Sequence, residues 1–139
     1  MTPRIRNMML VDDNDIDQEQ YKRIIKRSGI VDNLEVFYYA DEAFEYLKSN
    51  PDVTVDVILL DINMPRMDGF EFLEKVTSEL GHEVARVVII MLTTSLDPKD
   101  RERASKFDLV RDFINKPLEI SHVEHAAQLL VEARDASDP

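Results

Sequence analysis

The sequence predicts an α/β domain in which a parallel sheet is covered by helices on both faces. Short runs of β-branched and aliphatic residues alternate five times with longer segments of helical period. This alternation is typical of right-handed βαβ units. In the third run, residues 57–60 are all apolar, as expected of a strand that is buried on both faces. We therefore expect a three-layer (βα)5 doubly wound domain with a five-stranded parallel sheet.

Five apolar runs mark the expected strands. Val, Ile and Leu dominate most of them, and branched side chains of this kind suit the pleated surface of a sheet. Each run is followed by polar or turn-forming residues and then by a helical pattern, so we expect the strands to pair in parallel. The expected strands cover residues 8–11, 34–39, 55–60, 87–92 and 110–114.

Apolar side chains recur at helical spacing after each expected strand. The first helix is expected to end near Ser28-Gly29, the second before Asn50-Pro51 and the third before Gly81, since Gly and Pro commonly follow helix ends. The fourth begins near Asp97-Pro98, because Pro is tolerated at the first helical position. The side chains expected to face inward are Ile16, Tyr21, Ile24 and Ile25; Ala43, Phe44 and Leu47; Phe70, Leu73, Val76 and Leu80; and Ile120, Val123, Ala127 and Leu130.

Length and composition indicate one globular domain. The 139 residues, 44% of them apolar, supply a core without a disulfide or metal staple. The absence of Cys excludes a thiolate metal site and a Cys nucleophile, and it suits a reducing cytoplasm. No signal peptide or membrane-spanning run is visible. The net charge of -11 disfavours nucleic-acid binding. We expect a single cytoplasmic domain over 1–139, with its core at 8–131 and flexible ends at 1–6 and 134–139.

Polar side chains follow four of the five expected strands. Parallel strands bring their carboxyl ends to one edge of the sheet, where ligands bind in such folds. Three carboxylates about 5 Å apart repel one another by roughly 3 kcal/mol per pair at an effective dielectric near 20, so this edge requires a cation. Mg²⁺ prefers such oxygen ligands, and Mn²⁺ could substitute for it. The residues at this edge are Asp12 and Asp13, Asp61, Thr93 and Thr94, and Lys116.

Four strings of sequence resemble the receiver domain of two-component response regulators. They are LVDDN (10–14), LLDINMPRMDGFEFL (59–73), MLTTS (91–95) and FINKP (113–117). Gaps of 48, 32 and 23 residues separate Asp13, Asp61, Thr93 and Lys116, and each gap fits the intervening elements. The resemblance extends from about Met8 to about Val131. It implies a flavodoxin-like fold with strand order 2-1-3-4-5.

The resemblance also implies roles for the matching acidic residues and their loop. Asp61 would be the phosphoacceptor and a metal ligand. Asp13 would bind Mg²⁺ directly, Asp12 would hold a metal-bound water, and the backbone carbonyl of Asn63 would complete the protein ligands. Pro65 contributes to the geometry of this loop, because proline restricts its predecessor.

Further roles are implied for residues near the ends of the fourth and fifth strands. Lys116 and Thr93 would contact the phosphoryl group. Thr93 and Phe113 would form a conformational switch, and Thr94, together with Asn63, would control the access of water. Pro117 falls where the family has a cis peptide that aims the lysine into the pocket.

As a whole, the resemblance implies a stand-alone receiver that accepts a phosphoryl group from a sensor histidine kinase or a histidine phosphotransfer protein. The TTS string and the NMP loop are similar to single-domain regulators, of chemotaxis type or associated with phytochrome-type kinases. Output would run to a protein target through the fourth helix, fifth strand and fifth helix. The last helix lacks the basic motif of receivers that dimerise through that face, so we expect a monomer or weak homodimer without nucleic-acid or membrane partners.

Other interpretations of the same residues remain open. Asp12, Asp13 and Asp15 could cap the first helix, and Phe113 could be an ordinary core aromatic. A small Mg²⁺-dependent phosphatase also uses an Asp nucleophile, but such enzymes place a second Asp where this chain has Asn63. A receiver-like adaptor that is never phosphorylated is disfavoured because no core site residue is missing.

Two minor features carry less weight. His122 and His125 are expected to lie on a solvated face. The stretch SKFDLVRD (105–112) lacks the Gly that commonly ends the fourth helix, so this helix end is expected to be unusual.

Overall fold

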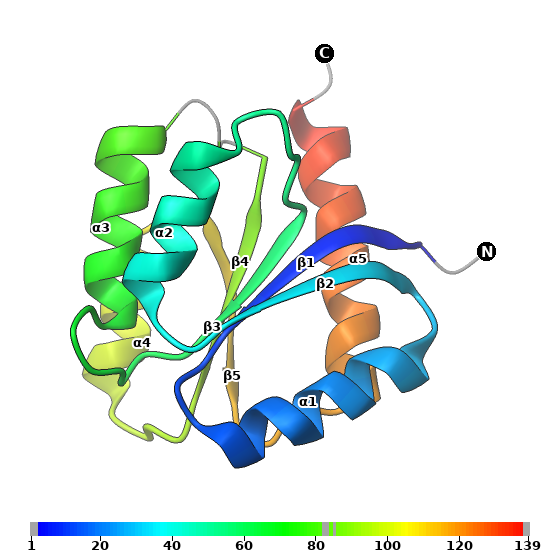
Figure 1. Ribbon diagram of the computed structural model, residues 1–139, viewed down its shortest axis with the longest axis horizontal. Helices are drawn as coiled ribbons and strands as arrows, with labels where there is room; N and C mark the ends of the chain where they lie inside the picture. The colour runs from blue at the N-terminus through cyan, green and yellow to red at the C-terminus, as the bar shows by residue number, and fades with distance from the viewer. Residues whose placement is uncertain (1–2, 82–83, 85, 138–139) are drawn as a thin grey trace.

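Five parallel strands form the central sheet of the computed structural model, which describes residues 3–81, 84 and 86–137 (Figure 1). The strand order is β2-β1-β3-β4-β5, which confirms the predicted topology. Met8 of the first strand lies opposite both Leu34 and Val57, so β1 is paired on both sides. The strands are β1 (Ile5–Val11), β2 (Val31–Phe37), β3 (Val57–Leu60), β4 (Val88–Thr93) and β5 (Val110–Asn115).

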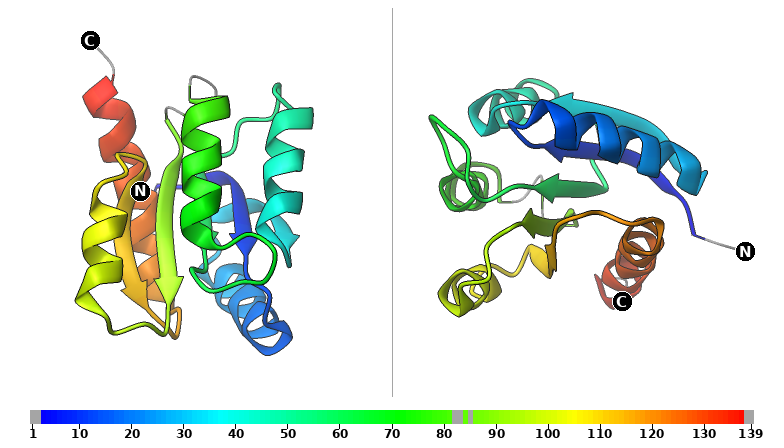
Figure 2. Two further views of the ribbon diagram at one scale, coloured as in Figure 1. Left: turned by 90° about the vertical axis from the view of Figure 1, so that its left-hand side faces the viewer. Right: turned by 90° about the horizontal axis from the view of Figure 1, so that it is seen from below.

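Among the described residues, five helices cover the two faces of the sheet and complete the three layers (Figure 2). Helices α1 and α5 pack on one face, whereas α2, α3 and α4 cover the other. This arrangement confirms the predicted doubly wound fold. The helices are α1 (Asp15–Ser28), α2 (Ala40–Ser49), α3 (Gly69–Leu80), α4 (Pro98–Ser105) and α5 (Ile120–Ser137).

The hydrophobic core consists of two clusters, one on each face of the sheet. Successive side chains of a strand point to opposite faces, so Ile58 and Leu60 join the α2, α3 and α4 side, while Val57 and Leu59 join the α1 and α5 side. All four are 2% exposed or less, as the uninterrupted apolar run predicts.

Most predicted helix faces are confirmed, but those of α1 and α5 are wrong at their first residue. The stripe of α3 is buried from Phe70 to Leu80. Ile16 of α1, in contrast, is 71% exposed. It precedes Tyr21 by five residues, which places it about 140° around the helix from that buried ring. Ile120 at the start of α5 is also 36% exposed.

Parts of the two end segments that were expected to be flexible belong to regular structure. Ile5 is fully buried, and its amide donates to the Ile30 carbonyl at 2.7 Å, so β1 begins within the segment 1–6. Helix α5 continues through Arg134 to Ser137, and the Arg134 guanidinium forms an ion pair with buried Asp56. These contacts order both segments. Residues 1–2 and 138–139 lie outside the described residues.

The end of α4 lacks a left-handed residue, as the missing glycine predicts. The helix has eight residues, and Lys106 follows it in the right-handed conformation. The Lys106 amide donates to the Arg103 carbonyl at 3.2 Å, and the Phe107 amide donates to the Ala104 carbonyl at 3.1 Å. Tightening of the last turn therefore satisfies these carbonyls.

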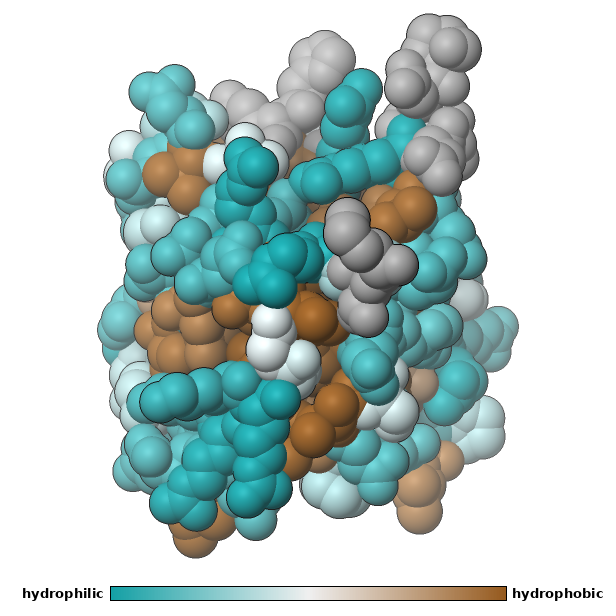
Figure 3. Space-filling model, turned by 90° about the vertical axis from the view of Figure 1, so that its right-hand side faces the viewer, coloured by the Kyte–Doolittle hydropathy of each residue, from teal (hydrophilic) through white to brown (hydrophobic). Residues whose placement is uncertain are grey.

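The face drawn in Figure 3 is mainly polar. On the side that carries α5 and the start of β1, hydrophilic side chains surround a smaller apolar area (Figure 3). None of the helices within the described residues is both long and apolar enough to cross a membrane.

Candidate functional site

Three carboxylates meet at the carboxyl edge of the sheet. Val11 and Leu60 are register partners in β1 and β3, so the residues that follow them, Asp12 and Asp61, are neighbours. The Asp61 amide donates to the Val11 carbonyl at 3.0 Å. One oxygen each from Asp12, Asp13 and Asp61 lies within 4.8 Å of the others. The structure thus brings together the predicted acidic residues.

Burial distinguishes these three acids. Asp12 is 1% exposed and Asp61 is 7% exposed, whereas Asp13 lies at the surface. The Asp12 carboxylate accepts from the Asn14 amide at 2.9 Å. Asn14, rather than any of the Asp residues, caps α1 by accepting from the Asp17 amide at 2.9 Å. The interpretation of Asp12, Asp13 and Asp15 as caps of this helix is therefore wrong.

The Lys116 ammonium lies among these acids. Its Nζ is 2.9 Å from Asp12 Oδ2, 3.5 Å from Asp61 Oδ2 and 2.7 Å from Asp17 Oδ2. The Lys116 amide donates to the Thr93 carbonyl at 2.8 Å, which fixes the end of β5 beside β4. The peptide bond to Pro117 is cis, as the family resemblance implies.

Asp17 is the member of this cluster that sequence reasoning missed. It lies in the first turn of α1, where an acidic residue is typical of any helix start. The available signal was its position four residues after Asp13 on a helix that leaves the same sheet edge. With Asp17, the cluster that contains Lys116 has four carboxylates instead of the predicted three.

Burial and charge alter the acidity of the site. Burial raises the pKa of Asp61 to about 6; Lys116 opposes this shift, while Asp12 and Asp13 add to it. Burial also raises the pKa of Asp12, against the opposing hydrogen bonds from the Asn14 amide and from Lys116. Keeping these carboxylates ionised therefore costs free energy, and a bound divalent cation would offset that cost.

Lys116 remains protonated despite its burial. Burial alone lowers the pKa of this ammonium, but hydrogen bonds to Asp17 and Asp12 outweigh that effect and the pKa is raised overall. The site therefore has a fixed positive charge beside Asp61 at neutral pH.

The loop after β3 folds back against Asp61. The Gly69 amide donates to the Ile62 carbonyl at 2.8 Å and closes the loop. A Cβ at Gly69 would lie 2.6 Å from the Asp61 carbonyl oxygen, so only glycine permits this approach. Asn63 is exposed within the loop. The Met67 amide donates to the Pro65 carbonyl at 2.8 Å.

Arg66 holds the tip of this loop against the start of α2. Its backbone is left-handed, with φ of 71°. The guanidinium donates to the Asp41 carboxylate and lies over the Tyr39 ring, 3.9 Å from its centroid. The hydrogen bond from Arg66 lowers the pKa of Asp41. The loop that follows Asp61 is thus anchored at both its base and its tip.

Thr93 is the last residue of β4 and Thr94 follows it, and the two side chains differ in exposure. Thr93 is fully buried, and its hydroxyl oxygen accepts from the Ser95 amide at 3.0 Å, so it organises the start of the following loop. Thr94 is exposed. The hydroxyl proton of Thr93 is left to donate to another acceptor, as its predicted contact with a phosphoryl group requires.

Phe113 is part of the core. Its side chain is 8% exposed and belongs to the cluster under α2, α3 and α4. Arg101 of α4 lies over the ring, 4.9 Å from its centroid, and donates to the Phe113 carbonyl at 3.3 Å. The core interpretation is therefore confirmed, while the switching role stays a prediction.

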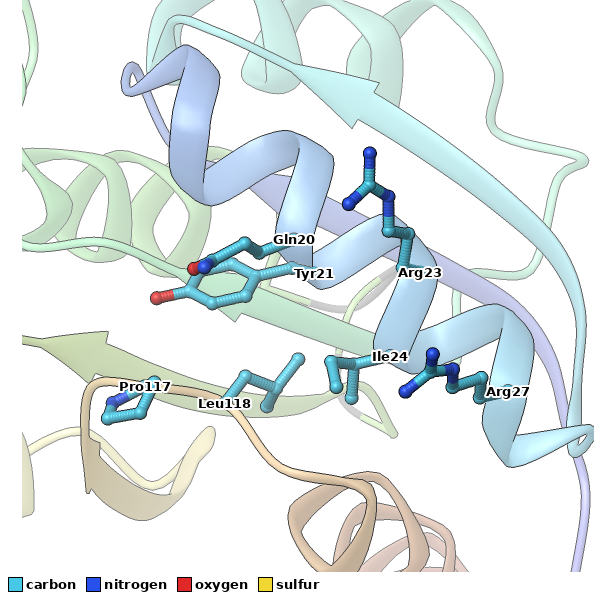
Figure 4. A pocket seen from close by; sticks show the side chains of 7 residues that line it. All are labelled: Gln20, Tyr21, Arg23, Ile24, Arg27, Pro117 and Leu118. Atoms are coloured by element: carbon cyan, nitrogen blue, oxygen red, sulfur yellow. The ribbon is translucent and has the colours of Figure 1, made fainter.

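A groove of about 260 Å³ adjoins the site between α1 and the segment after β5. In Figure 4 the side chains of Tyr21, Ile24 and Leu118 face one another along it. Arg23, Arg27, Gln20 and Pro117 complete its lining. Burial raises the pKa of Tyr21 to about 12, with the charge of Lys116 opposing the shift and Asp17 adding to it, so its hydroxyl stays protonated.

Comparison with known proteins identifies the family of this chain. The model of the response regulator receiver domain matches residues 8–128. The chain belongs to the response regulator receiver domain family. The match covers every strand end that contributes to the acidic cluster, and it confirms the family predicted from the four sequence strings.

Relatives of this receiver domain include kinases and response regulators. It is 31% identical over 129 residues to hybrid signal transduction histidine kinase B of Dictyostelium discoideum, covering 86% of the chain but 6% of that kinase. It is 27% identical over 146 residues to the two-component response regulator ARR6 of Arabidopsis thaliana, covering 98% of the chain and 75% of the relative. The chain spans 12% of the Myxococcus xanthus gliding motility regulatory protein, so it matches only a small part of some relatives.

Solved structures share the fold. A two-component response regulator from Cytophaga hutchinsonii superposes with a TM-score of 0.87 at 24% identity, covering 93% of this receiver domain and 98% of that chain. The bacteriophytochrome response regulator AtBRR gives a TM-score of 0.76 at 28% identity, covering 93% and 94% of the two chains.

Membership of the family establishes the general function. The chain is a phosphorelay receiver domain, a signalling domain rather than a conventional enzyme. Receiver domains accept phosphoryl groups from histidine kinases and bind Mg²⁺. The residues present fit this ion, because three carboxylates supply oxygen ligands within 4.8 Å of one another.

Proposed function

We propose that this receiver domain is phosphorylated on Asp61 by a sensor histidine kinase or a histidine phosphotransfer protein, and that it passes the signal to a protein partner. The observation that carries the proposal is the convergence of Asp12, Asp13 and Asp61 beside the Lys116 ammonium. The four residues come from three strand ends that are distant in sequence. Structural demands alone do not call for such a cluster, because like charges at this spacing repel.

Asp61 acts as the nucleophile. Its ionised carboxylate attacks the phosphorus of a phosphohistidine; an O–P bond forms, the P–N bond breaks, and its electron pair returns to the imidazole. The carboxylate needs no general base, because most of it is ionised at neutral pH. Hydrolysis of the acyl phosphate by water later restores Asp61 and releases inorganic phosphate.

Asp61, Asp13 and the Asn63 backbone carbonyl would hold Mg²⁺, with Asp12 contributing through a water, and Mn²⁺ could replace it. When bound, the ion neutralises the charge that spreads over the phosphoryl oxygens. Lys116 supplies a second positive charge, and the Thr93 hydroxyl donates a hydrogen bond to a phosphoryl oxygen. Thr94 and Asn63, at the exposed mouth of the site, govern the access of water, while Pro65 and the cis bond before Pro117 shape the two flanking loops.

Phosphorylation would alter the face formed by α4, β5 and α5. The added charge of about -1.5 to -2 draws the Thr93 hydroxyl, which now accepts from Ser95, toward the phosphoryl oxygens. The loop after β4 then moves, and the packing around Phe113 changes with it. This is a population shift between two packings, and the resulting surface is the one that a downstream protein would read.

Intact mass measurement after incubation with Mg²⁺ and acetyl phosphate tests the proposal. We expect the protein to gain one phosphoryl group, and we expect Asp61→Asn to abolish this gain. Asp15→Asn is the matched control, since it removes an exposed carboxylate and should leave the gain intact. A protein that gains no phosphoryl group from acetyl phosphate or from any histidine kinase would instead be an adaptor. Sustained release of phosphate from small esters would indicate a phosphatase.

A further inference from the structure

Asp17 makes the shortest contact of the Lys116 ammonium. Its Oδ2 is 2.7 Å from Nζ, compared with 2.9 Å for Asp12 and 3.5 Å for Asp61. The pair is shielded from solvent, since the Lys116 side chain is 10% exposed and that of Asp17 is 24% exposed. Asp17 lies outside the four sequence strings that resemble the family, so none of the roles assigned above includes it.

The position of Asp17 is fixed by its helix. Its amide donates to the Asn14 side chain in the cap of α1, and its carboxylate reaches Lys116 across 99 residues of sequence. An ammonium has three protons to donate. Two of them are taken by Asp12 and Asp17, and the 3.5 Å separation from Asp61 is too long for a strong hydrogen bond.

We propose that Asp17 is a positioning residue that competes with the phosphoryl group for Lys116 and strengthens the binding of Mg²⁺. This inference rests on the proposed function. Before phosphorylation, Asp17 holds the ammonium on the α1 side of the pocket. After phosphorylation, the ammonium donates hydrogen bonds both to Asp17 and to the phosphoryl oxygens.

The two effects of Asp17 have opposite signs. Its negative charge repels a phosphoryl group and competes for Lys116, so its removal should favour the phosphorylated state. The same charge balances Lys116 next to the acidic cluster, so its removal should weaken the attraction for a divalent cation. A residue that only stabilised the fold would not move these two affinities in opposite directions.

Beryllofluoride, which mimics a phosphoryl group without forming a permanent bond, gives an equilibrium measure of the first effect. We expect Asp17→Asn to bind beryllofluoride about two- to fivefold more tightly at saturating Mg²⁺, as measured by 19F NMR. We expect the same variant to bind Mg²⁺ alone about two- to fivefold more weakly, as measured by calorimetry at low salt. Asp17→Glu keeps the charge and should restore the affinity for Mg²⁺.

Asp15→Asn is the matched control, because Asp15 lies in the same first turn of α1 and carries the same charge. It should change both affinities much less than Asp17→Asn does. Asp17→Ser provides a second test of the position should Asp17→Asn lose its native circular dichroism spectrum.

Three results would overturn the inference: Asp17→Asn behaving as Asp15→Asn does, both affinities moving in the same direction, or Asp17→Glu failing to restore the affinity for Mg²⁺. Wild-type protein that binds neither Mg²⁺ nor beryllofluoride would contradict the proposed function itself. The failure of the inference is therefore distinguishable from the failure of the function.

Discussion

At the scale of single residues, the central feature is the buried carboxyl group of Asp61, whose ionised form is disfavoured. Asp61 is 7% exposed and its pKa is raised to about 6 by burial, with Asp12 and Asp13 adding to the shift against Lys116. An ordinary aspartate has a pKa near 3.8. The folded protein therefore holds a proton on Asp61 more readily than the unfolded chain does.

This difference predicts how stability depends on pH in the absence of divalent ions. Because the folded pKa is the higher one, the free energy of unfolding should fall as pH rises from about 4 to about 6 and stay low above that. We compare the free energy of unfolding of Asp61→Asn with that of wild type. The variant's value minus the wild-type value should be about 2–3 kcal/mol higher at pH 8 than at pH 3.5.

Urea unfolding with EDTA, followed by far-UV circular dichroism, measures the effect. Asp97→Asn, which alters an exposed carboxylate, serves as the control. A stability difference between wild type and Asp61→Asn that is the same at both pH values would contradict the prediction. Added Mg²⁺ should stabilise the wild type at pH 8 more than it stabilises the variant.

Several residues of the site were predictable because acidic and basic side chains directly follow the predicted strands. Asp12, Asp13, Asp61 and Lys116 follow strand ends that parallel pairing brings to one edge. Asp17 was not predictable in this way. Its place beside Lys116 depends on the rotation of α1 and on the direction of the lysine side chain, and an acidic residue in the first turn of a helix is common for other reasons.

At the scale of elements, the start of helix α3 packs closely against the backbone of Asp61. Asp68 and Glu71 form a capping box at its start, and Gly69 lies against the backbone of Asp61. An Asp-Gly pair before a helical pattern is typical of a cap and a turn. This pair does not predict the contact with Asp61, because that contact depends on how the returning helix meets β3.

Gly69→Ala should therefore damage the site as well as the fold. Its Cβ would lie 2.6 Å from the Asp61 carbonyl oxygen and 3.0 Å from the Ile62 Cα, and backbone atoms cannot yield as a flexible side chain can. We expect a loss of stability of about 1–3 kcal/mol, together with slower phosphorylation by acetyl phosphate. Ser78→Ala, an exposed change on the same helix, is the control. Unchanged stability and phosphorylation in Gly69→Ala would contradict the close approach.

Prediction of elements succeeded where two signals agreed. Helix α1 ends at Gly29, whose left-handed φ of 69° matches the expected glycine stop, and α4 begins with Pro98 after an Asp97 cap. The predicted strand boundaries were wrong where polar residues belong to a strand. Strand β2 begins at Val31 rather than at residue 34, because Asp32 and Asn33 belong to an edge strand with a solvated side.

At the scale of the whole molecule, one buried carboxylate holds several elements together at the edge of the sheet opposite the acidic cluster. Asp56 is 2% exposed. One of its oxygens accepts from the amides of Arg6 and Asn7 at 3.0 and 2.9 Å, and the other pairs with Arg134. This residue therefore links the start of β1, the start of β3 and the last turns of α5.

Removing Asp56 should loosen this junction. Asp56→Ala leaves the Arg6 and Asn7 amides without their acceptor and Arg134 without this ion pair, and we expect a loss of about 2–4 kcal/mol in the free energy of unfolding. Arg134→Ala should cost less, because that side chain is 46% exposed. Asp52→Ala, an exposed change nearby in sequence, is the control in urea unfolding. Equal stabilities of Asp56→Ala and Asp52→Ala would contradict this role.

The overall topology was predictable, but the ordered length of the chain was not. Alternating strand and helix patterns indicate the layers, and the family resemblance implies the strand order. Neither shows that the polar segment around Arg134 continues α5, since that depends on Asp56, 78 residues away. Contacts over such separations leave no periodic pattern in the sequence.

The junction at Asp56 has a practical consequence for anyone who immobilises this protein. Ile5 opens β1 and Ser137 closes α5, and both ends lie toward the edge remote from Asp61. A tether attached near Ile5 or near the last turn of α5 would therefore leave the acidic cluster at the carboxyl edge facing the medium. A sensor surface coated through either position should present that edge equally well to a partner in solution.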